Sequence, residues 1–142
     1  MWLLLDEIEC KDLSGLDADA IVALTQHQLP KLLSLSLSGN SYLQSSAFAH
    51  LDNSSWPQLC SLDLSHTLVD IASMSGLRQA LWPLLSNLDL RATGFKTAAD
   101  IGLLAQASLP RLRTLDLSCN SLDAAAMPQL AEGFWPGLYT CG

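Results

Sequence analysis

Three aspartates recur at nearly equal spacing, and each lies between two leucines: Asp63, Asp89 and Asp116. Ser36 occupies the same place in an earlier Leu-Ser-Leu segment. Carboxylates that lie side by side can act as general acid and base, hold Ca²⁺, or attract a ligand that carries Lys or Arg. Which role applies depends on the elements that present these side chains.

Other chemical signatures are missing from the sequence. The three histidines fall in different parts of the chain, at His27, His50 and His66. There is no Ser-His-Asp set, no H-E-x-x-H motif and no glycine-rich phosphate loop. We therefore predict that the chain is not an enzyme, has no catalytic residues, and needs neither a cofactor nor a metal ion.

The four cysteines form no C-x-x-C pair, and no histidine lies at zinc-finger spacing from them. They fall in separate repeats of the pattern described below, whereas a disulfide needs Cα atoms within about 7 Å. We predict free thiols in a reducing compartment at Cys10, Cys60, Cys119 and Cys141.

Composition and charge exclude further classes. Hydrophobic residues make up 49% of the chain and charged residues 15%, so a folded core is expected. The formal net charge of −7 and the lack of a basic run argue against nucleic-acid binding. No segment approaches the ~20 apolar residues that span a bilayer, and the apolar residues 1–5 are too few for a secretion signal. We expect a cytoplasmic protein that binds no membrane.

A repeat organises the chain. Five prolines follow one another in steps of 27, 26, 27 and 26 residues, and a leucine lies two residues after each: Pro30, Pro57, Pro83, Pro110 and Pro136. From the first four of these leucines the pattern L-x-x-L-x-L-x-x-N/T recurs. Its ninth position is Asn40 and Asn120 in two units, but Thr67 and Thr93 in the others. At the threonines we expect the turn to persist with weaker hydrogen bonding.

Each repeat predicts a strand followed by a helix. Leucine alternates with polar residues early in the unit, as in a short strand with one buried face. The later half changes to helical spacing, for example at Ala98, Ile101 and Leu104. Gly76 predicts that the helix of the unit 59–84 is the weakest, and Pro128 predicts a helix that starts no earlier than about residue 125.

This pattern resembles the leucine-rich repeat family, and the 26–27-residue period is similar to that of its ribonuclease-inhibitor-like class. The resemblance implies an α/β solenoid, a curved horseshoe segment of about five repeats with a parallel β-sheet on the concave face and helices on the convex face. Strands ~4.8 Å apart and helices ~10 Å across make such a stack bend. We expect one domain, 1–142: a degenerate first repeat at about 5–31, repeats at about 32–58, 59–84, 85–111 and 112–137, and a truncated repeat at 138–142.

In this fold the side chains between the strand leucines point out of the concave sheet. The predicted binding residues form two columns on this face, with one further residue, Asn87. The acidic column consists of Ser36, Asp63, Asp89 and Asp116. The column beside it consists of Ser38, Ser65, Arg91 and Ser118. Such a surface suits a partner that brings Lys or Arg. An alternative stays open, in which Asp is common here because it bonds neighbouring serines or backbone. An exposed sheet cannot desolvate the carboxyls enough for acid–base chemistry.

We predict a non-enzymatic protein–protein interaction module that binds its partner on the concave face. The alternatives are a substrate-recognition or regulatory part of a larger assembly, similar to F-box-type ubiquitin-ligase receptors or Ran GTPase activators, or a fragment of a longer array. Because each unit is covered only by its neighbours, we also expect self-association through uncapped ends. The tryptophans before the proline corners are expected to pack in the core: Trp56, Trp82 and Trp135.

Overall fold

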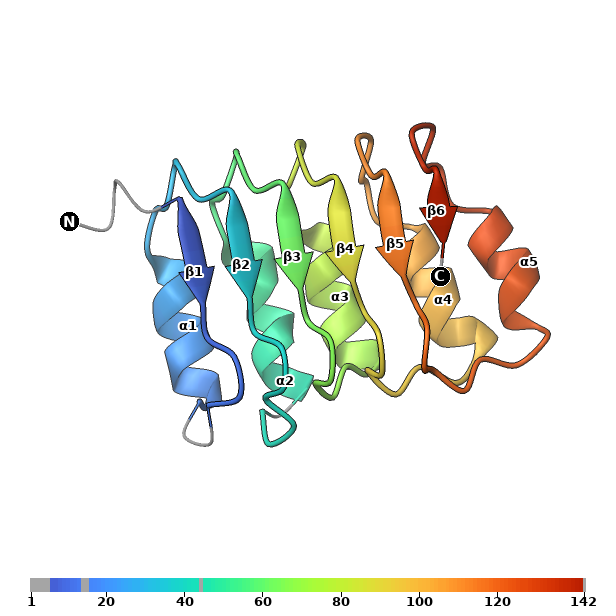
Figure 1. Cartoon of the computed structure of the whole chain (residues 1–142), viewed down its shortest axis with the longest axis horizontal. Helices are drawn as coiled ribbons and strands as arrows, with labels where there is room; N and C mark the ends of the chain where they lie inside the picture. Colours follow the sequence, from blue (N-terminus) through green and yellow to red (C-terminus); the bar gives the residue numbers. More distant parts are fainter. Residues whose placement is uncertain (1–5, 14–15, 44, 142) are drawn as a thin grey trace.

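A computed structural model describes residues 6–13, 16–43 and 45–141 of the chain. In this part, six short strands form one parallel sheet in chain order, and helices alternate with them (Figure 1). The strands are β1 (Glu7–Glu9), β2 (Ser34–Ser36), β3 (Ser61–Asp63), β4 (Asn87–Asp89), β5 (Thr114–Asp116) and β6 (Thr140–Cys141). The helical segments are α1 (Ala18–Gln26), α2 (Ser45–Phe48), the 3-10 helix η2 (Ala49–Asn53), α3 (Ile71–Gln79), α4 (Ala98–Ala105) and α5 (Ala126–Ala131).

Neighbouring strands pair in a register equal to the repeat period. From β2 to β5 the central leucines face one another in order: Leu35, Leu62, Leu88 and Leu115. Each of them is at most 3% exposed, because the alternation of the strand turns it to the covered face of the sheet. The residues on either side of each leucine therefore point away from the core.

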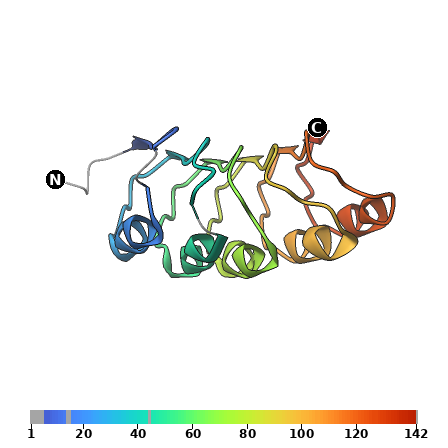
Figure 2. The same cartoon turned by 90° about the horizontal axis from the view of Figure 1, so that it is seen from below.

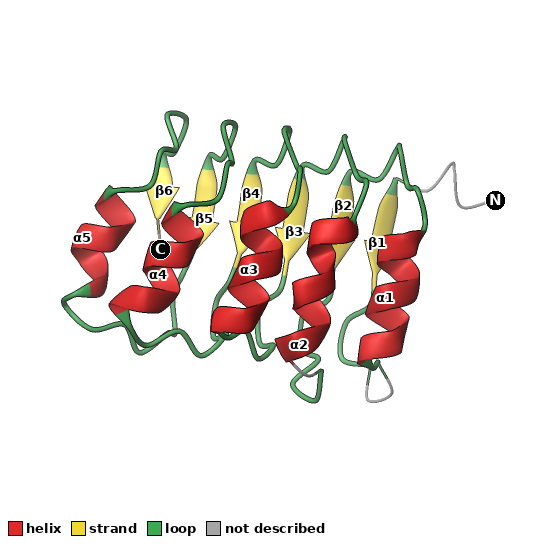
Figure 3. Cartoon of the chain, turned by 180° about the vertical axis from the view of Figure 1, so that it is seen from behind, coloured by secondary structure: helices red, strands yellow, loops and turns green. Residues whose placement is uncertain are grey.

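The helices lie on one face of the sheet and leave the other face open (Figure 3). Viewed toward the ends of the strands, the row of helices is longer than the row of strands, so the molecule bends with the sheet on the inner side (Figure 2). Helices need about 10 Å each and strands about 4.8 Å, which accounts for the bend. The predicted parallel sheet alternating with helices is confirmed.

The three tryptophans pack in the core, as predicted. Trp56, Trp82 and Trp135 are 0%, 1% and 7% exposed. Trp56 and Trp82 stack with ring centroids 6.2 Å apart and ring planes 3° from parallel. The indole N–H of Trp82 also donates to the Ser54 hydroxyl at 3.0 Å. This buried hydrogen bond ties Trp82 to the preceding unit, which also contains Trp56.

The prediction of the weakest helix is wrong. α3 runs unbroken through Gly76, whereas α2 is the shortest of the described helices and continues as the 3-10 helix η2. A Cβ on Gly76 would lie 2.7 Å from the carbonyl oxygen of Ala49 and would also meet that of Phe48. The glycine therefore allows α3 to approach the preceding helical segment closely, and it leaves its own helix intact.

Reciprocal capping boxes fix the starts of two helices. Asp70 and Ser73 form a reciprocal capping box on α3, and Thr97 and Asp100 form one on α4. α5 begins at Ala126, which confirms the start expected from the proline in its first turn. No helix in the described part of the chain combines the length and the apolar character needed to cross a membrane.

The ninth position of the repeat forms the expected turn. The residue before it has a φ between 52° and 76° in five units: Asp12, Gly39, His66, Ala92 and Cys119. The side-chain amides of Asn40 and Asn120 each donate to a carbonyl of their own unit and to one of the preceding unit, at 2.6–2.8 Å. The hydroxyls of Thr67 and Thr93 donate to a carbonyl within their own unit. The threonines therefore make fewer side-chain hydrogen bonds at this turn than the asparagines do, which is in line with the expectation.

Cys10, Cys60 and Cys119 are free thiols, in agreement with that part of the cysteine prediction. The side chain of Cys141 lies outside the described part of the chain. Residues 1–5 and Gly142, which belong to the expected first and last units, also lie outside it.

Candidate binding surface on the open face of the sheet

The open face of the sheet carries the predicted acidic column in register. Ser36 on β2 pairs with Asp63 on β3, and Asp63 pairs in turn with Asp89 on β4. Asp89 pairs with Asp116 on β5. A second row of side chains, in which Ser61, Asn87 and Thr114 face one another, lies on the other side of the strand leucines from this acidic row. The fold therefore brings together side chains that are about one repeat apart in sequence.

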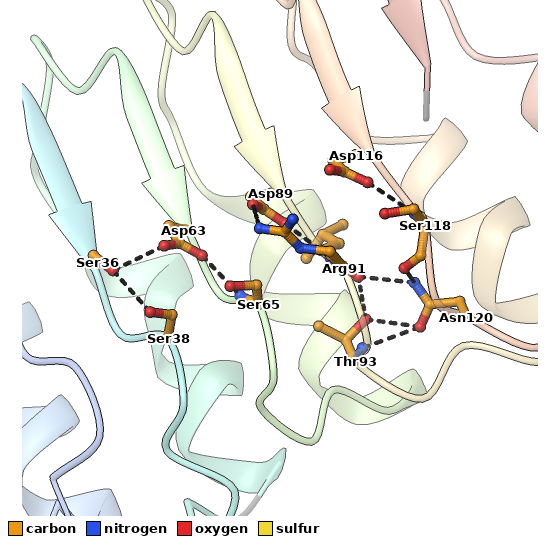
Figure 4. A network of polar contacts seen from close by, with 11 residues as sticks. Ser36, Ser38, Asp63, Ser65, Asp89, Arg91, Thr93, Asp116, Ser118 and Asn120 are labelled. Atoms are coloured by element: carbon orange, nitrogen blue, oxygen red, sulfur yellow. Dashed lines mark hydrogen bonds and ion pairs between the residues drawn. The ribbon is translucent and has the colours of Figure 1, made fainter.

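Each aspartate of the column is anchored by a hydrogen bond to the backbone two residues further on. One carboxylate oxygen accepts the N–H of Ser65 at 3.0 Å in Asp63, of Arg91 at 2.9 Å in Asp89, and of Ser118 at 2.9 Å in Asp116 (Figure 4). The backbone thus fixes the direction of each carboxylate, as the alternative explanation from the sequence requires. This anchoring leaves the second oxygen of each carboxylate for another partner.

The second oxygens differ along the column. In Asp63 this oxygen accepts the Ser36 hydroxyl at 3.0 Å, and in Asp89 it pairs with the Arg91 guanidinium at 3.1 Å. The Arg91 and Asp89 side chains are 43% and 27% exposed, so the pair faces solvent and contributes about 0–1 kcal/mol to stability. Arg91 therefore compensates one of the three negative charges of the column.

The serines of the two predicted columns lie at different depths. Ser36 and Ser65 are only 6% and 3% exposed, and both hydrogen-bond to Asp63. These two buried serines therefore orient the Asp63 carboxylate by hydrogen bonds and are not themselves accessible to a partner. Ser38 and Ser118 are more accessible, and the Ser38 hydroxyl lies 3.4 Å from that of Ser36.

The environment of Asp63 lowers its pKa. Burial acts in the opposite direction and would raise the pKa of this carboxyl. Hydrogen bonds from the hydroxyl and N–H of Ser65 and from the Ser36 hydroxyl outweigh burial, with help from the Lys11 charge, and hold the pKa below its ordinary value of 3.8. Asp63 is therefore ionised at neutral pH.

Asp116 also has a lowered pKa, for a simpler reason. The hydroxyl and then the backbone N–H of Ser118 stabilise its charged form, the Arg91 charge adds to this, and burial opposes it only in part. Neither Asp63 nor Asp116 can serve as a proton donor at neutral pH. Both can attract a cation.

The two rows border a shallow hollow of about 430 Å³ on the face of β3, β4 and β5. Polar side chains from all three strands line it: Ser61, Asp63, Asn87, Asp89, Thr114 and Asp116. The Thr114 hydroxyl donates to the Asn87 side-chain oxygen at 2.8 Å, which orients the amide. Ser61 and Thr114 were not among the predicted binding residues, although their place before the strand leucines is visible in the repeat.

The chemistry of this surface is that of hydrogen-bond acceptors and negative charge. Within the described residues, no group of three or more His, Cys, Asp or Glu side chains is arranged to hold a metal ion. The chain matches no protein-family model and no curated protein sequence.

Proposed function

We propose that this chain is a leucine-rich-repeat solenoid of the ribonuclease-inhibitor-like class and binds a protein partner on the open face of its sheet. Parallel strands that pair in the repeat register, with helices along the opposite face, support this assignment. The partner contacts the hollow over β3 to β5 with Lys or Arg side chains.

The observation that carries this proposal is the in-register column of aspartates at the border of the hollow. Two of the three, Asp63 and Asp116, have lowered pKa values and are anchored by backbone N–H groups, so their negative charge is fixed in place. Carboxylates that are already held in place lose little conformational freedom when a partner binds, which reduces the entropic cost of binding. Complementary charge then favours a basic partner over others.

A protein surface fits the hollow better than a small molecule does. Small ligands are held in concave pockets that enclose most of their surface. The hollow is instead open and bordered by carboxylates, an amide and hydroxyls carried on three neighbouring strands. Such a shallow surface matches the rows of side chains that a second protein presents.

The experiment uses the whole chain as bait, identifies the captured protein by mass spectrometry, and measures its affinity after purification. A triple variant, Asp63→Asn, Asp89→Asn and Asp116→Asn, keeps an acceptor oxygen for each backbone N–H. We expect about fivefold weaker binding and a flatter salt dependence, because the partner loses charge pairs of about 0.5 kcal/mol each with Asp63 and Asp116, the two carboxylates that Arg91 does not compensate.

The matched control removes three acidic charges from the helical side of the molecule: Asp19→Asn, Asp52→Asn and Glu132→Gln. These residues are exposed and lie away from the sheet, on α1, η2 and the end of α5. The control should bind like the unaltered chain. If a folded triple variant of the sheet binds as tightly as this control, the acidic column only supports the fold and the proposal fails.

A further inference from the structure

The last two complete units are tied together by one asparagine. The Asn120 side chain donates to the Leu90 carbonyl of the preceding unit at 2.8 Å. Its oxygen accepts three backbone N–H groups of that unit at 2.9–3.2 Å, those of Thr93, Gly94 and Phe95. A primary amide can do this because it carries both an acceptor oxygen and two donors.

We call the boundary between two neighbouring units a joint. The joint between the units 59–84 and 85–111, which precedes the one tied by Asn120, has Thr93 in the place of that asparagine. The Thr93 hydroxyl donates to Leu90 O of its own unit at 2.7 Å. At the turn, the link to the preceding unit is a backbone hydrogen bond from the Val69 N–H to Thr93 O at 3.1 Å. Besides the backbone bonds between the strands, the side-chain hydrogen bonds that cross this joint among the described residues run from the Ser86 hydroxyl to Cys60 O and, exposed to solvent, from Arg78 to Gln106.

The other threonine joint, between the units 32–58 and 59–84, is reinforced in the core. It contains the stacked pair of Trp56 and Trp82 and the buried hydrogen bond from Trp82 to Ser54. On the sheet, the Ser36 hydroxyl donates across the same joint to Asp63 at 3.0 Å. These contacts compensate for the missing amide.

We propose that the joint between the units 59–84 and 85–111 is a hinge at which the stack opens before it opens at the neighbouring joints. Asp63 on β3 and Asp89 on β4 lie on opposite sides of this joint, and the hollow extends across it. Opening there changes the width of the hollow and adapts the acidic column to what it binds. The hinge itself does not depend on the identity of the partner or on the proposed function.

Hydrogen exchange of the whole chain tests the hinge, because a simple stack of units opens from its ends and protects its middle. The amides of Leu64 and His66 bond across the hinge, and those of Leu90 and Ala92 bond across the following joint, which is nearer the end. We expect Leu64 and His66 to exchange at least about tenfold faster than Leu90 and Ala92. If Leu64 and His66 exchange as slowly as Leu90 and Ala92, or more slowly, the proposal is overturned.

A substitution provides the second arm of the test. Thr93→Asn introduces the amide that Asn120 supplies at the next joint, and it should slow exchange at Leu64 and His66 about tenfold. The matched variant Thr67→Asn should instead slow Leu37 and Gly39, which bond across the preceding joint. Equal slowing of both pairs of amides by either variant would indicate a general gain in stability and contradict a local hinge. If Thr93→Asn does not fold, the order of exchange in the unaltered chain decides.

Discussion

At the scale of single residues, one hydroxyl decides whether a buried tryptophan is hydrogen-bonded. Trp82 donates to Ser54, which lies 28 residues earlier. The indole N–H of Trp135 is buried and has no hydrogen-bond partner among the described residues. The residue 28 positions before Trp135 is Ala107, which is 5% exposed and has no polar side-chain atom. In the repeat register Ala107 thus takes the place of Ser54 and offers a methyl group instead of an acceptor.

We predict that Ala107→Ser raises the free energy of unfolding by about 1 kcal/mol, because it gives the buried Trp135 N–H a partner. Urea denaturation followed by tryptophan fluorescence measures the change. Ala105→Ser adds the same hydroxyl to a half-buried position of α4 and should give no gain. An equal effect of the two substitutions would show that the hydroxyl does not reach the indole.

At the scale of elements, helix contacts decide what a glycine does. Gly76 in α3 and Gly102 in α4 both lie within helices, where glycine costs about 1 kcal/mol relative to alanine. A Cβ at Gly76 would meet the backbone of the preceding helical segment. A Cβ at Gly102 would meet the side-chain oxygen of Gln129 at 3.1 Å, and this flexible end can move away.

We therefore predict opposite effects of the same substitution. Gly76→Ala should lower the free energy of unfolding by about 1–3 kcal/mol, because the backbones must separate, whereas Gly102→Ala should raise it by up to about 1 kcal/mol. Thermal and urea unfolding of the two variants provide the comparison, and each variant serves as the control for the other. A stabilising Gly76→Ala would mean that α3 does not need the close approach.

At the scale of the whole molecule, the anchored aspartates couple the stability of the stack to pH. Asp63 and Asp116 belong to different units, and both have pKa values below the ordinary 3.8. A pKa that is lower in the folded state means that the unfolded chain binds protons more readily. The resulting stabilisation is present above about pH 4 and is lost as the pH falls through the folded-state pKa values.

We predict that the urea midpoint decreases as the pH falls below about 4, and that the double variant Asp63→Asn and Asp116→Asn shows a shallower decrease. Asn keeps an acceptor for the backbone N–H groups but cannot take up a proton. The double variant Asp19→Asn and Asp52→Asn, on the helical side, is the control and should retain the decrease. A decrease of the same slope in all three proteins would place the acid sensitivity elsewhere.

Much of this architecture is determined by the sequence alone. The 26–27-residue period fixes which strand residues become neighbours, and the alternation of leucine with polar residues fixes which of them are buried. These two regularities predict the parallel sheet, the buried tryptophans and the alignment of Asp63, Asp89 and Asp116. Each depends on local patterning repeated at a constant interval, so no knowledge of the packing was needed.

Only the tertiary structure decided what the side chains of neighbouring units do to one another. The burial of Ser36 and Ser65 and the close approach at Gly76 depend on distances across a joint between units. The repeat predicts that such residues are neighbours, but it does not give the depth of a hydroxyl or the separation of two helices. Those follow from how side chains of different volume pack between sheet and helices, and the packing differs from one joint to the next.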